Sequence, residues 1–229
     1  MTDSPPRQFL AGLADMAPLG LAVAVFGMLY GATAIRHGLS AGETVLMSAI
    51  VFAGSAQFLA VGLWSEPAPW LALGFAALLV NLRHVLMSAS LGRKMQAFPG
   101  WSRFFAVYIL ADESWALCER RAQGQALTPA YYIGVAGSMY AIWLATSALG
   151  AALGGLIAHP ETYGLDFAFP AAFISIVMGF AKTWRAAPVV VASGLTALAA
   201  QHAFGGAWYV LAGAGAGMFA AALTPDAAP

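Results

Sequence analysis

One apolar stretch of the sequence, residues 48–58, contains glycine and polar residues where a membrane helix normally carries hydrocarbon. Gly54, Ser55 and Gln57 lie within it. Glycine weakens a helix, and a serine hydroxyl and a glutamine amide need hydrogen-bond partners where there is no water. Interrupted membrane helices expose backbone groups and small polar side chains at the depth where a transporter binds its solute. We therefore expect a helix break at Gly54 and Ser55, with Gln57 adding a polar side chain to a binding site.

A second polar group lies at residues 81–90, in another apolar stretch. Asn81, His84 and Ser88 are three and four positions apart, so on a helix they share one face, with Arg83 one step around it. An arginine in hydrocarbon costs about 2.5–3.5 kcal/mol on insertion scales, so Arg83 should pair or face water. Alternatively, Arg83 lies near the cytoplasmic end of its helix and extends to the lipid headgroups. For His84, a packed or hydrogen-bonded imidazole is a simpler interpretation than a proton carrier.

Two adjacent carboxylates, Asp112 and Glu113, form a third candidate group inside the short apolar piece 104–118. Burial raises the pKa of a carboxyl group, and a neighbouring like charge raises it further. Such a group exchanges protons nearer neutral pH, as proton-coupled transport requires. The alternative is an ordinary helix start at Asp112, with Glu113 paired to Arg83 or Arg120.

Composition assigns the chain to the membrane. Of its 229 residues, 61% are hydrophobic and 9% are charged, whereas ordinary soluble domains carry about 25% charged residues. The formal net charge is zero, which gives no reason to expect a nucleic-acid partner. The single cysteine, Cys118, excludes an intrachain disulfide and has no companion for a metal cluster. The sequence contains no Walker motif and no haem, iron–sulfur or hydrolase pattern, so we expect neither a cofactor nor an enzyme.

Hydropathy predicts the helices that position these residues. A span of roughly 20 apolar residues crosses a bilayer as a helix. This length predicts seven spans in one all-α, polytopic membrane domain over residues 1–229, near 14–35, 44–64, 68–91, 130–157, 168–184, 186–203 and 207–223. The piece 104–118 is left over, as a short re-entrant or an eighth segment. Asp15 interrupts the place where a signal peptide would have its apolar core, so we expect the first span itself to target the chain.

Basic loop residues indicate the orientation. If 104–118 enters the membrane and returns, all eight of them fall on the cytoplasmic side, and if it crosses, they divide evenly. They are Arg36, Arg93, Lys94, Arg103, Arg120, Arg121, Lys182 and Arg185. The returning arrangement agrees better with the charge rule, and it is the one we expect.

A weak internal similarity suggests two three-helix repeats, near 14–91 and 166–223. Asp15 and Pro18 open the first, and Asp166 and Pro170 open the second. These are also ordinary helix start signals, so chance explains the similarity equally well. The repeats are parallel if 104–118 returns and inverted if it crosses.

Glycines four residues apart occur in three of the predicted spans and allow two backbones to approach closely. The pairs are Gly27/Gly31, Gly150/Gly154 and Gly213/Gly217. We expect them to serve packing within the chain. The alternative for at least one pair is a docking face for a separate small membrane subunit.

Four segments follow one another in a recognisable order. They are 48–58, Asn81–His84 with Met87 and Ser88, Asp112–Ser114, and Gly164–Asp166 with Pro170–Phe173. Together they resemble the AzlC-type branched-chain amino acid permease family, over most of the chain from about Asp15 onward. Ala111 departs from the resemblance, because the family often has threonine before the acidic pair.

The resemblance implies the large subunit of a two-component secondary transporter that exports branched-chain amino acids across the bacterial inner membrane. It also implies proton exchange as the driving force and a small AzlD-like four-helix membrane subunit as the partner. A zwitterionic substrate needs a positive partner for its carboxylate and acceptors for its ammonium group. Half-helix N-termini near Gly54 and Ser55, or Arg83, suit the first role. Glu113 or Asp112 suits the second role or carries the proton.

We therefore expect a proton-coupled exporter of small apolar amino acids that acts as a heteromer. The first alternative is a non-transporting membrane scaffold or assembly subunit. It predicts that Gln57→Ala and Glu113→Gln leave cellular function intact, while Gly-to-Leu changes abolish it. An intramembrane enzyme that turns over a lipid or peptide through Glu113 ranks third.

Overall fold

A computed structural model of the chain describes residues 4–65, 67–68, 70–154, 186–204 and 208–224. All regular elements in these ranges are helices, which confirms the predicted all-α class. The predicted span 168–184 lies outside the described residues, with Asp166, Pro170 and Lys182, and so does part of the second predicted repeat. The chain divides into two compact units, Met1–Gly62 with Asn81–Ala158 and Leu63–Val80 with His159–Pro229.

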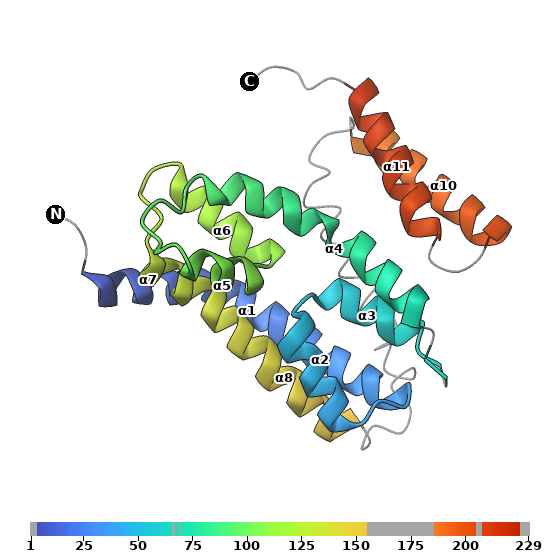
Figure 1. The fold of residues 1–229 in the computed structure, drawn as a ribbon, viewed down its shortest axis with the longest axis horizontal. Coiled ribbons are helices and arrows are strands. Elements are labelled where there is room, and N and C mark those ends of the chain that lie inside the picture. The colour runs from blue at the N-terminus through green and yellow to red at the C-terminus, as the bar shows by residue number, and fades with distance from the viewer. Residues whose placement is uncertain (1–3, 66, 69, 155–185, 205–207, 225–229) are drawn as a thin grey trace. The chain divides into compact units, whose positions relative to one another are not determined.

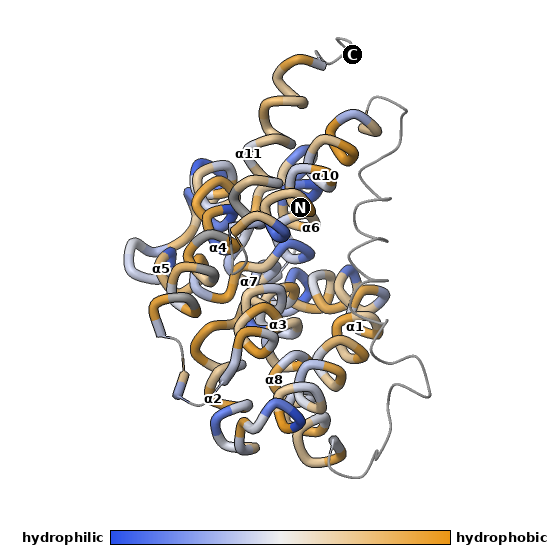
Figure 2. Tube along the Cα trace, turned by 90° about the vertical axis from the view of Figure 1, so that its right-hand side faces the viewer, coloured by the Kyte–Doolittle hydropathy of each residue, from blue (hydrophilic) through white to orange (hydrophobic). Residues whose placement is uncertain are grey.

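Several of the described helices suit a lipid bilayer. Four are long and apolar enough to cross a membrane, namely Pro5–Arg36, Leu73–Gly92, Pro129–Gly154 and Ala186–Phe204. Large apolar side chains are exposed on them, including Leu21 at 74% and Leu86 at 74%, and apolar residues follow most of the helical tube in Figure 2. Because water would disfavour such a surface, the chain is an integral membrane protein with several spans.

Two long helical stretches form the core of the first unit. One is α1 (Pro5–Arg36), and the other runs without interruption from Pro129 to Gly154. The second stretch consists of α7 (Pro129–Tyr132), the π-helix η1 (Ile133–Gly137) and α8 (Ser138–Gly154). α1 and α8 lie side by side in Figure 1.

Glycine allows α1 and α8 to touch through their backbones. A side chain at Gly31 would collide with the Ser147 carbonyl, and one at Gly150 would collide with the Met28 carbonyl. Towards the other end of the pair, Gly12 meets the Tyr131 carbonyl. Contact positions rise together along both helices, so α1 and α8 run parallel. The glycines of this pair therefore serve packing within the chain.

The second predicted span consists of two helices, α2 (Ala41–Val51) and α3 (Gly54–Gly62). Phe52 separates them, because its backbone has φ 39° and ψ 46°. This left-handed conformation cannot continue a right-handed helix and is uncommon for a residue with a side chain. The break therefore lies two residues before Gly54, and Gly54 and Ser55, where we expected it, begin the second helix.

The chain folds back at this break. On a straight helix Ser48 and Gln57 would be about 13 Å apart, yet the Gln57 amide nitrogen lies 3.1 Å from the Ser48 hydroxyl. Tyr30 of α1 contacts both helices, since its hydroxyl donates to the Met47 sulfur at 3.0 Å and its ring meets Phe58 edge-on at 5.7 Å. α2 and α3 thus form a helical hairpin, named the first hairpin, where we predicted a single crossing.

The piece 104–118 also forms two short helices. α5 (Ser102–Tyr108) and α6 (Asp112–Ala122) come after α4 (Trp70–Gly92) in the chain. They are named the second hairpin. α6 carries charged residues at both ends and lies outside the four candidate spans.

Two ion pairs fix the register of α6 against α4. Asp112, the first residue of α6, pairs with Arg83 in the middle of α4. Two turns later, Glu119 pairs with Lys94, just beyond the end of α4. α6 therefore runs parallel to the second half of α4, and α5 must bring the chain back to the level of Arg83. This register favours the returning arrangement of 104–118 over a full crossing.

The expected orientation, with all eight basic loop residues on one side, is wrong. Arg121 at the end of α6 donates to the Gln8 side chain at 2.7 Å, whereas Arg36 is the last residue of α1. Along α1, Gln8 and Arg36 are about 42 Å apart, so Arg36 and Arg121 lie at opposite ends of this unit. The error has a physical cause: the first hairpin turns back where hydropathy suggested a crossing, which exchanges the sides of the membrane for the later segments.

In the second unit, α10 (Ala186–Phe204) and α11 (Trp208–Leu223) pack antiparallel. Gly213 faces Ala197 and Ser193, whereas Gly217 faces Ser193 and Val189. This glycine pair therefore also serves packing within the chain.

Candidate functional site

Arg83 connects the two hairpins. Its Nη2 donates to the Ser55 hydroxyl at 2.5 Å, and its Nη1 lies 2.8 Å from the Asp112 carboxylate. Ser55 is the second residue of α3, and Asp112 is the first residue of α6. Arg83 is also central in its own helix, about 14 Å from either end of the span Leu73–Gly92. Its guanidinium therefore contacts the two hairpin tips and does not extend to the lipid headgroups.

The tips present the positive ends of two helices to this guanidinium. The first N–H groups of a helix have no partner within it, and the helix dipole adds partial positive charge there. Asp112 supplies the one carboxylate that pairs with Arg83 among the described residues. An anion that reached the tips would meet a guanidinium and two helix N-termini together.

Tyrosine hydroxyls contact the last turns of the other two hairpin helices, α2 and α5. The Ala49 carbonyl near the end of α2 accepts hydrogen bonds from the hydroxyls of Tyr108 and Tyr140, the latter at 3.0 Å. The Ala106 carbonyl in α5 accepts from the Tyr132 hydroxyl. Sequence reasoning missed these tyrosines, because their spacing does not indicate which carbonyl each would reach.

Three residues of α4 that are near one another in sequence each have a buried polar atom with no hydrogen-bond partner among the described residues. The atoms are Oδ1 of Asn81, Nε of Arg83 and Nδ1 of His84. An unpaired buried polar group costs about 1–3 kcal/mol, so each such atom calls for a ligand or a water molecule. The polar group predicted at residues 81–84 thus has unused donors and acceptors beside the hairpin tips.

Gln57 and Gly54 hold the first hairpin against α8. Gln57 is fully buried, its amide donates to Ser48, and its carbonyl accepts from the Trp143 indole at 3.0 Å. A Cβ at Gly54 would lie 2.9 Å from the Trp143 ring. Both amide atoms of Gln57 are therefore engaged within the protein, and Gly54 provides room for an indole.

Glu113 is next to Asp112 in the first turn of α6 and is half-buried. Among the described residues, no side chain forms an ion pair with it, so the predicted alternative of a pair with Arg83 or Arg120 is not seen. Burial raises the pKa of the Glu113 carboxyl, and the neighbouring Asp112 adds to this, while its own backbone N–H and Arg83 act in the opposite direction. The site thus holds one paired carboxylate and one carboxyl with an elevated proton affinity.

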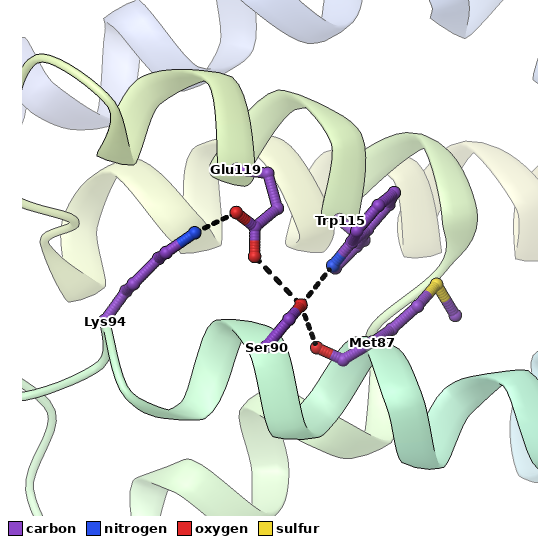
Figure 3. Close-up of polar contacts among 5 residues, drawn as sticks. All are labelled: Met87, Ser90, Lys94, Trp115 and Glu119. Atoms are coloured by element: carbon purple, nitrogen blue, oxygen red, sulfur yellow. Dashed lines mark hydrogen bonds and ion pairs between the residues drawn. The ribbon is translucent and has the colours of Figure 1, made fainter. Parts of the chain in front are cut away.

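A polar cluster further along α4 and α6 connects these two helices (Figure 3). The Trp115 indole donates to the Ser90 hydroxyl at 2.8 Å, and the Ser90 hydroxyl donates to Glu119 at 2.9 Å. Lys94 completes the cluster through its ion pair with Glu119. Sequence reasoning missed this cluster, although the seven-residue spacing from Arg83 to Ser90 and from Asp112 to Glu119 places each pair on one helix face.

Comparison with known proteins assigns the chain to a family. A sequence profile described as AzlC protein matches residues 18–157, which include both hairpins, Arg83, the second half of α1 and all of α8. The chain belongs to the AzlC family. This membership supports a role in membrane transport, and it is consistent with a protein that is not an enzyme.

Three relatives of this AzlC family member are 27–30% identical to it over the aligned residues. A membrane protein of Archaeoglobus fulgidus is 29% identical over 86% of each chain. The branched-chain amino acid transport protein AzlC of Bacillus subtilis is 30% identical over 69% of this chain and 61% of its own. The inner membrane protein YgaZ of Escherichia coli is 27% identical over 74% of this chain and 72% of its own. No solved structure matches the chain.

Proposed function

We propose that this protein is a secondary transporter that exports branched-chain or similar small apolar amino acids across the bacterial inner membrane. Proton exchange drives it, and a small AzlD-like membrane subunit completes it. The observation that carries the proposal is Arg83, which joins two half-helix N-termini in the middle of a membrane span, beside three unpaired buried polar atoms. The name of the Bacillus subtilis relative supports the class of substrate.

A zwitterionic amino acid is complementary to the Arg83–Asp112 pair. Its carboxylate can replace that of Asp112 on the guanidinium, while its ammonium group takes the Asp112 carboxylate. The exchange leaves the net charge of the site unchanged, so binding does not leave an isolated charge at membrane depth. The free oxygen of Asn81 is a further acceptor for the ammonium group.

Glu113 is the candidate proton carrier. Its carboxyl is half-buried, lies next to Asp112, and has no ion-pair partner among the described residues. A proton held there is released when a passage to water opens and the burial that favours the neutral form is lost. His84, the residue after Arg83, is a second polar group in this part of α4, and its Nδ1 has no hydrogen-bond partner among the described residues.

Transport by the full chain in proteoliposomes, with and without the co-purified small subunit, tests the proposal. Labelled leucine, valine and methionine should exchange, and an imposed pH gradient should accelerate the exchange. Arg83→Gln should reduce leucine exchange at least tenfold, because a charge-assisted hydrogen bond contributes about 1.5–3 kcal/mol. Arg103→Gln is the matched control, since Arg103 is exposed and lies at the start of α5.

Two further measurements separate binding from coupling. Glu113→Gln should retain leucine exchange and lose the response to the pH gradient. If neither leucine, valine nor methionine is transported by the wild-type protein with its subunit, transport is refuted and the scaffold alternative is favoured. If Arg83→Gln exchanges leucine like Arg103→Gln, the assignment of the site is wrong even though transport stands.

A further inference from the structure

A polar cavity lies at the end of α6, away from the hairpin tips. Its volume is about 200 Å³, and α1, α6 with the turn after it, and α7 contribute to its wall. It is lined by Asp15, Arg120, Arg121, Gly124, Gln125 and Tyr131. None of these residues has a part in the transport site proposed above.

The cavity has an excess of positive charge. Two guanidinium groups face one carboxylate, and the Tyr131 hydroxyl already donates to the Asp15 carboxylate at 2.7 Å. The residues that line it therefore carry a net charge of about +1. A ligand with one negative charge would neutralise the cavity.

Arg121 is held in position but is not saturated. Its guanidinium stacks over the Tyr131 ring at 4.4 Å, and its Nη2 donates to Gln8 at 2.7 Å. Its Nε is buried and has no partner among the described residues. The Arg120 side chain forms no hydrogen bond or ion pair with any other described residue. Fixed guanidinium groups with free N–H donors suit the oxygens of a phosphate.

Exposed apolar side chains occur in the same turn of α1 as Gln8. Gln8, which holds Arg121, is followed in α1 by Phe9 and Leu10, whose side chains are 37% and 61% exposed. Free phosphate has no apolar part that could contact such side chains, whereas a phospholipid carries acyl chains next to its phosphate. The cavity also lies at the end of the unit where Lys94 and Arg121 gather, which the positive-inside rule assigns to the cytoplasm.

We propose that this cavity binds the phosphate of an anionic phospholipid. Arg120 and Arg121 hold the phosphate oxygens, and the acyl chains lie along α1 beside Phe9 and Leu10. Basic pockets between membrane helices on the cytoplasmic side bind acidic headgroups in this way.

Lipid titration of the purified full chain in a neutral detergent tests the proposal. The probes are short-chain phosphatidylglycerol, short-chain phosphatidylcholine and inorganic phosphate, and bound lipid is counted by native mass spectrometry. One molecule of phosphatidylglycerol should bind to each protein. Its apparent Kd should be at least tenfold lower than that of phosphatidylcholine. Arg120→Gln should weaken phosphatidylglycerol about fivefold, the factor equivalent to about 1 kcal/mol for each basic residue near a membrane surface.

The double variant Arg120→Gln/Arg121→Gln should no longer bind phosphatidylglycerol more tightly than phosphatidylcholine. The control variant Arg93→Gln/Arg103→Gln should keep the wild-type ratio of the two Kd values within twofold. The control removes the same charge from exposed residues that do not line the cavity. Arg120→Gln alone keeps the test valid if the double variant fails to fold, because Arg120 has no partner to lose. If the control variant binds phosphatidylglycerol as weakly as the cavity variant does, general surface charge explains the effect and the proposal is overturned. Competition by inorganic phosphate at similar concentration would overturn the lipid assignment in favour of a soluble anion.

Discussion

Replacing Gln57 by methionine should loosen the first hairpin without creating a cavity. Methionine has nearly the volume of glutamine but cannot reproduce its two hydrogen bonds, to Ser48 at 3.1 Å and from Trp143 at 3.0 Å. Both partners are buried, so the Trp143 indole N–H loses its acceptor with no access to bulk water.

The loss of stability expected for Gln57→Met depends on the membrane environment. Side-chain hydrogen bonds in membrane proteins average about 0.6 kcal/mol and reach about 1.7 kcal/mol, because the unfolded chain in lipid also finds partners. Two bonds lost together should therefore lower the free energy of unfolding by about 1–3 kcal/mol. Full desolvation of an orphaned indole favours the upper end of this range.

Unfolding of the detergent-solubilised protein, monitored by tryptophan fluorescence against denaturant, measures this change. Gln123→Met is the control, because Gln123 is exposed just after α6. Trp143→Phe removes the orphaned donor, so the double variant should be less destabilised than the sum of the single variants. If Gln57→Met is as stable as the control, or if the two changes simply add, the hydrogen bonds do not hold the hairpin and the reasoning is refuted.

Three further outcomes are expected. Because burial raises the pKa of Glu113, its contribution to stability should be fully present below the ordinary carboxyl pKa of about 4.3 and be lost as the pH rises through the raised value. Thermal unfolding between pH 4 and pH 8 should show a smaller fall for Glu113→Gln than for the wild-type protein, and identical profiles would contradict this. Gly31→Leu should prevent folding or destabilise the protein by several kcal/mol through collision with α8, whereas Gly42→Leu, where nothing lies within 4 Å, should be tolerated in the same assay. Cys118 should resist maleimide until the protein unfolds, since it is fully buried and burial raises its pKa to about 12; rapid labelling of the folded protein would contradict its burial.

The sequence predicted that Arg83 needs a partner or water, because an arginine in an apolar span is costly. It did not predict which group pairs with Arg83, since the partner considered from the sequence was Glu113. In the structure Arg83 pairs with Asp112 and donates to Ser55. The pairing of Glu113 was not foreseeable in the same way, since two adjacent carboxylates compete for one guanidinium and the start of α6 decides which one reaches it.

The first hairpin could not be predicted from hydropathy. Residues 44–64 have the length and polarity of one crossing, and a helix pair that turns back has the same average composition. The turn itself depends on Phe52, a residue type that gives no sign of a left-handed backbone. The hydrogen bond between Ser90 and Glu119 could not be predicted either, because it joins residues 29 positions apart on two helices.

The parallel contact of α1 with α8 has a consequence for biosynthesis. Ser147, against which Gly31 packs, is made 116 residues later, and at about 5–20 residues per second the ribosome needs roughly 6–23 s to reach it. During that interval the glycine-lined face of α1 has only lipid to contact. A nascent chain that stops before residue 129 would keep this face open to other small-residue helices. Insertion machinery or a membrane chaperone would therefore have to shield α1 for longer than either hairpin takes to form.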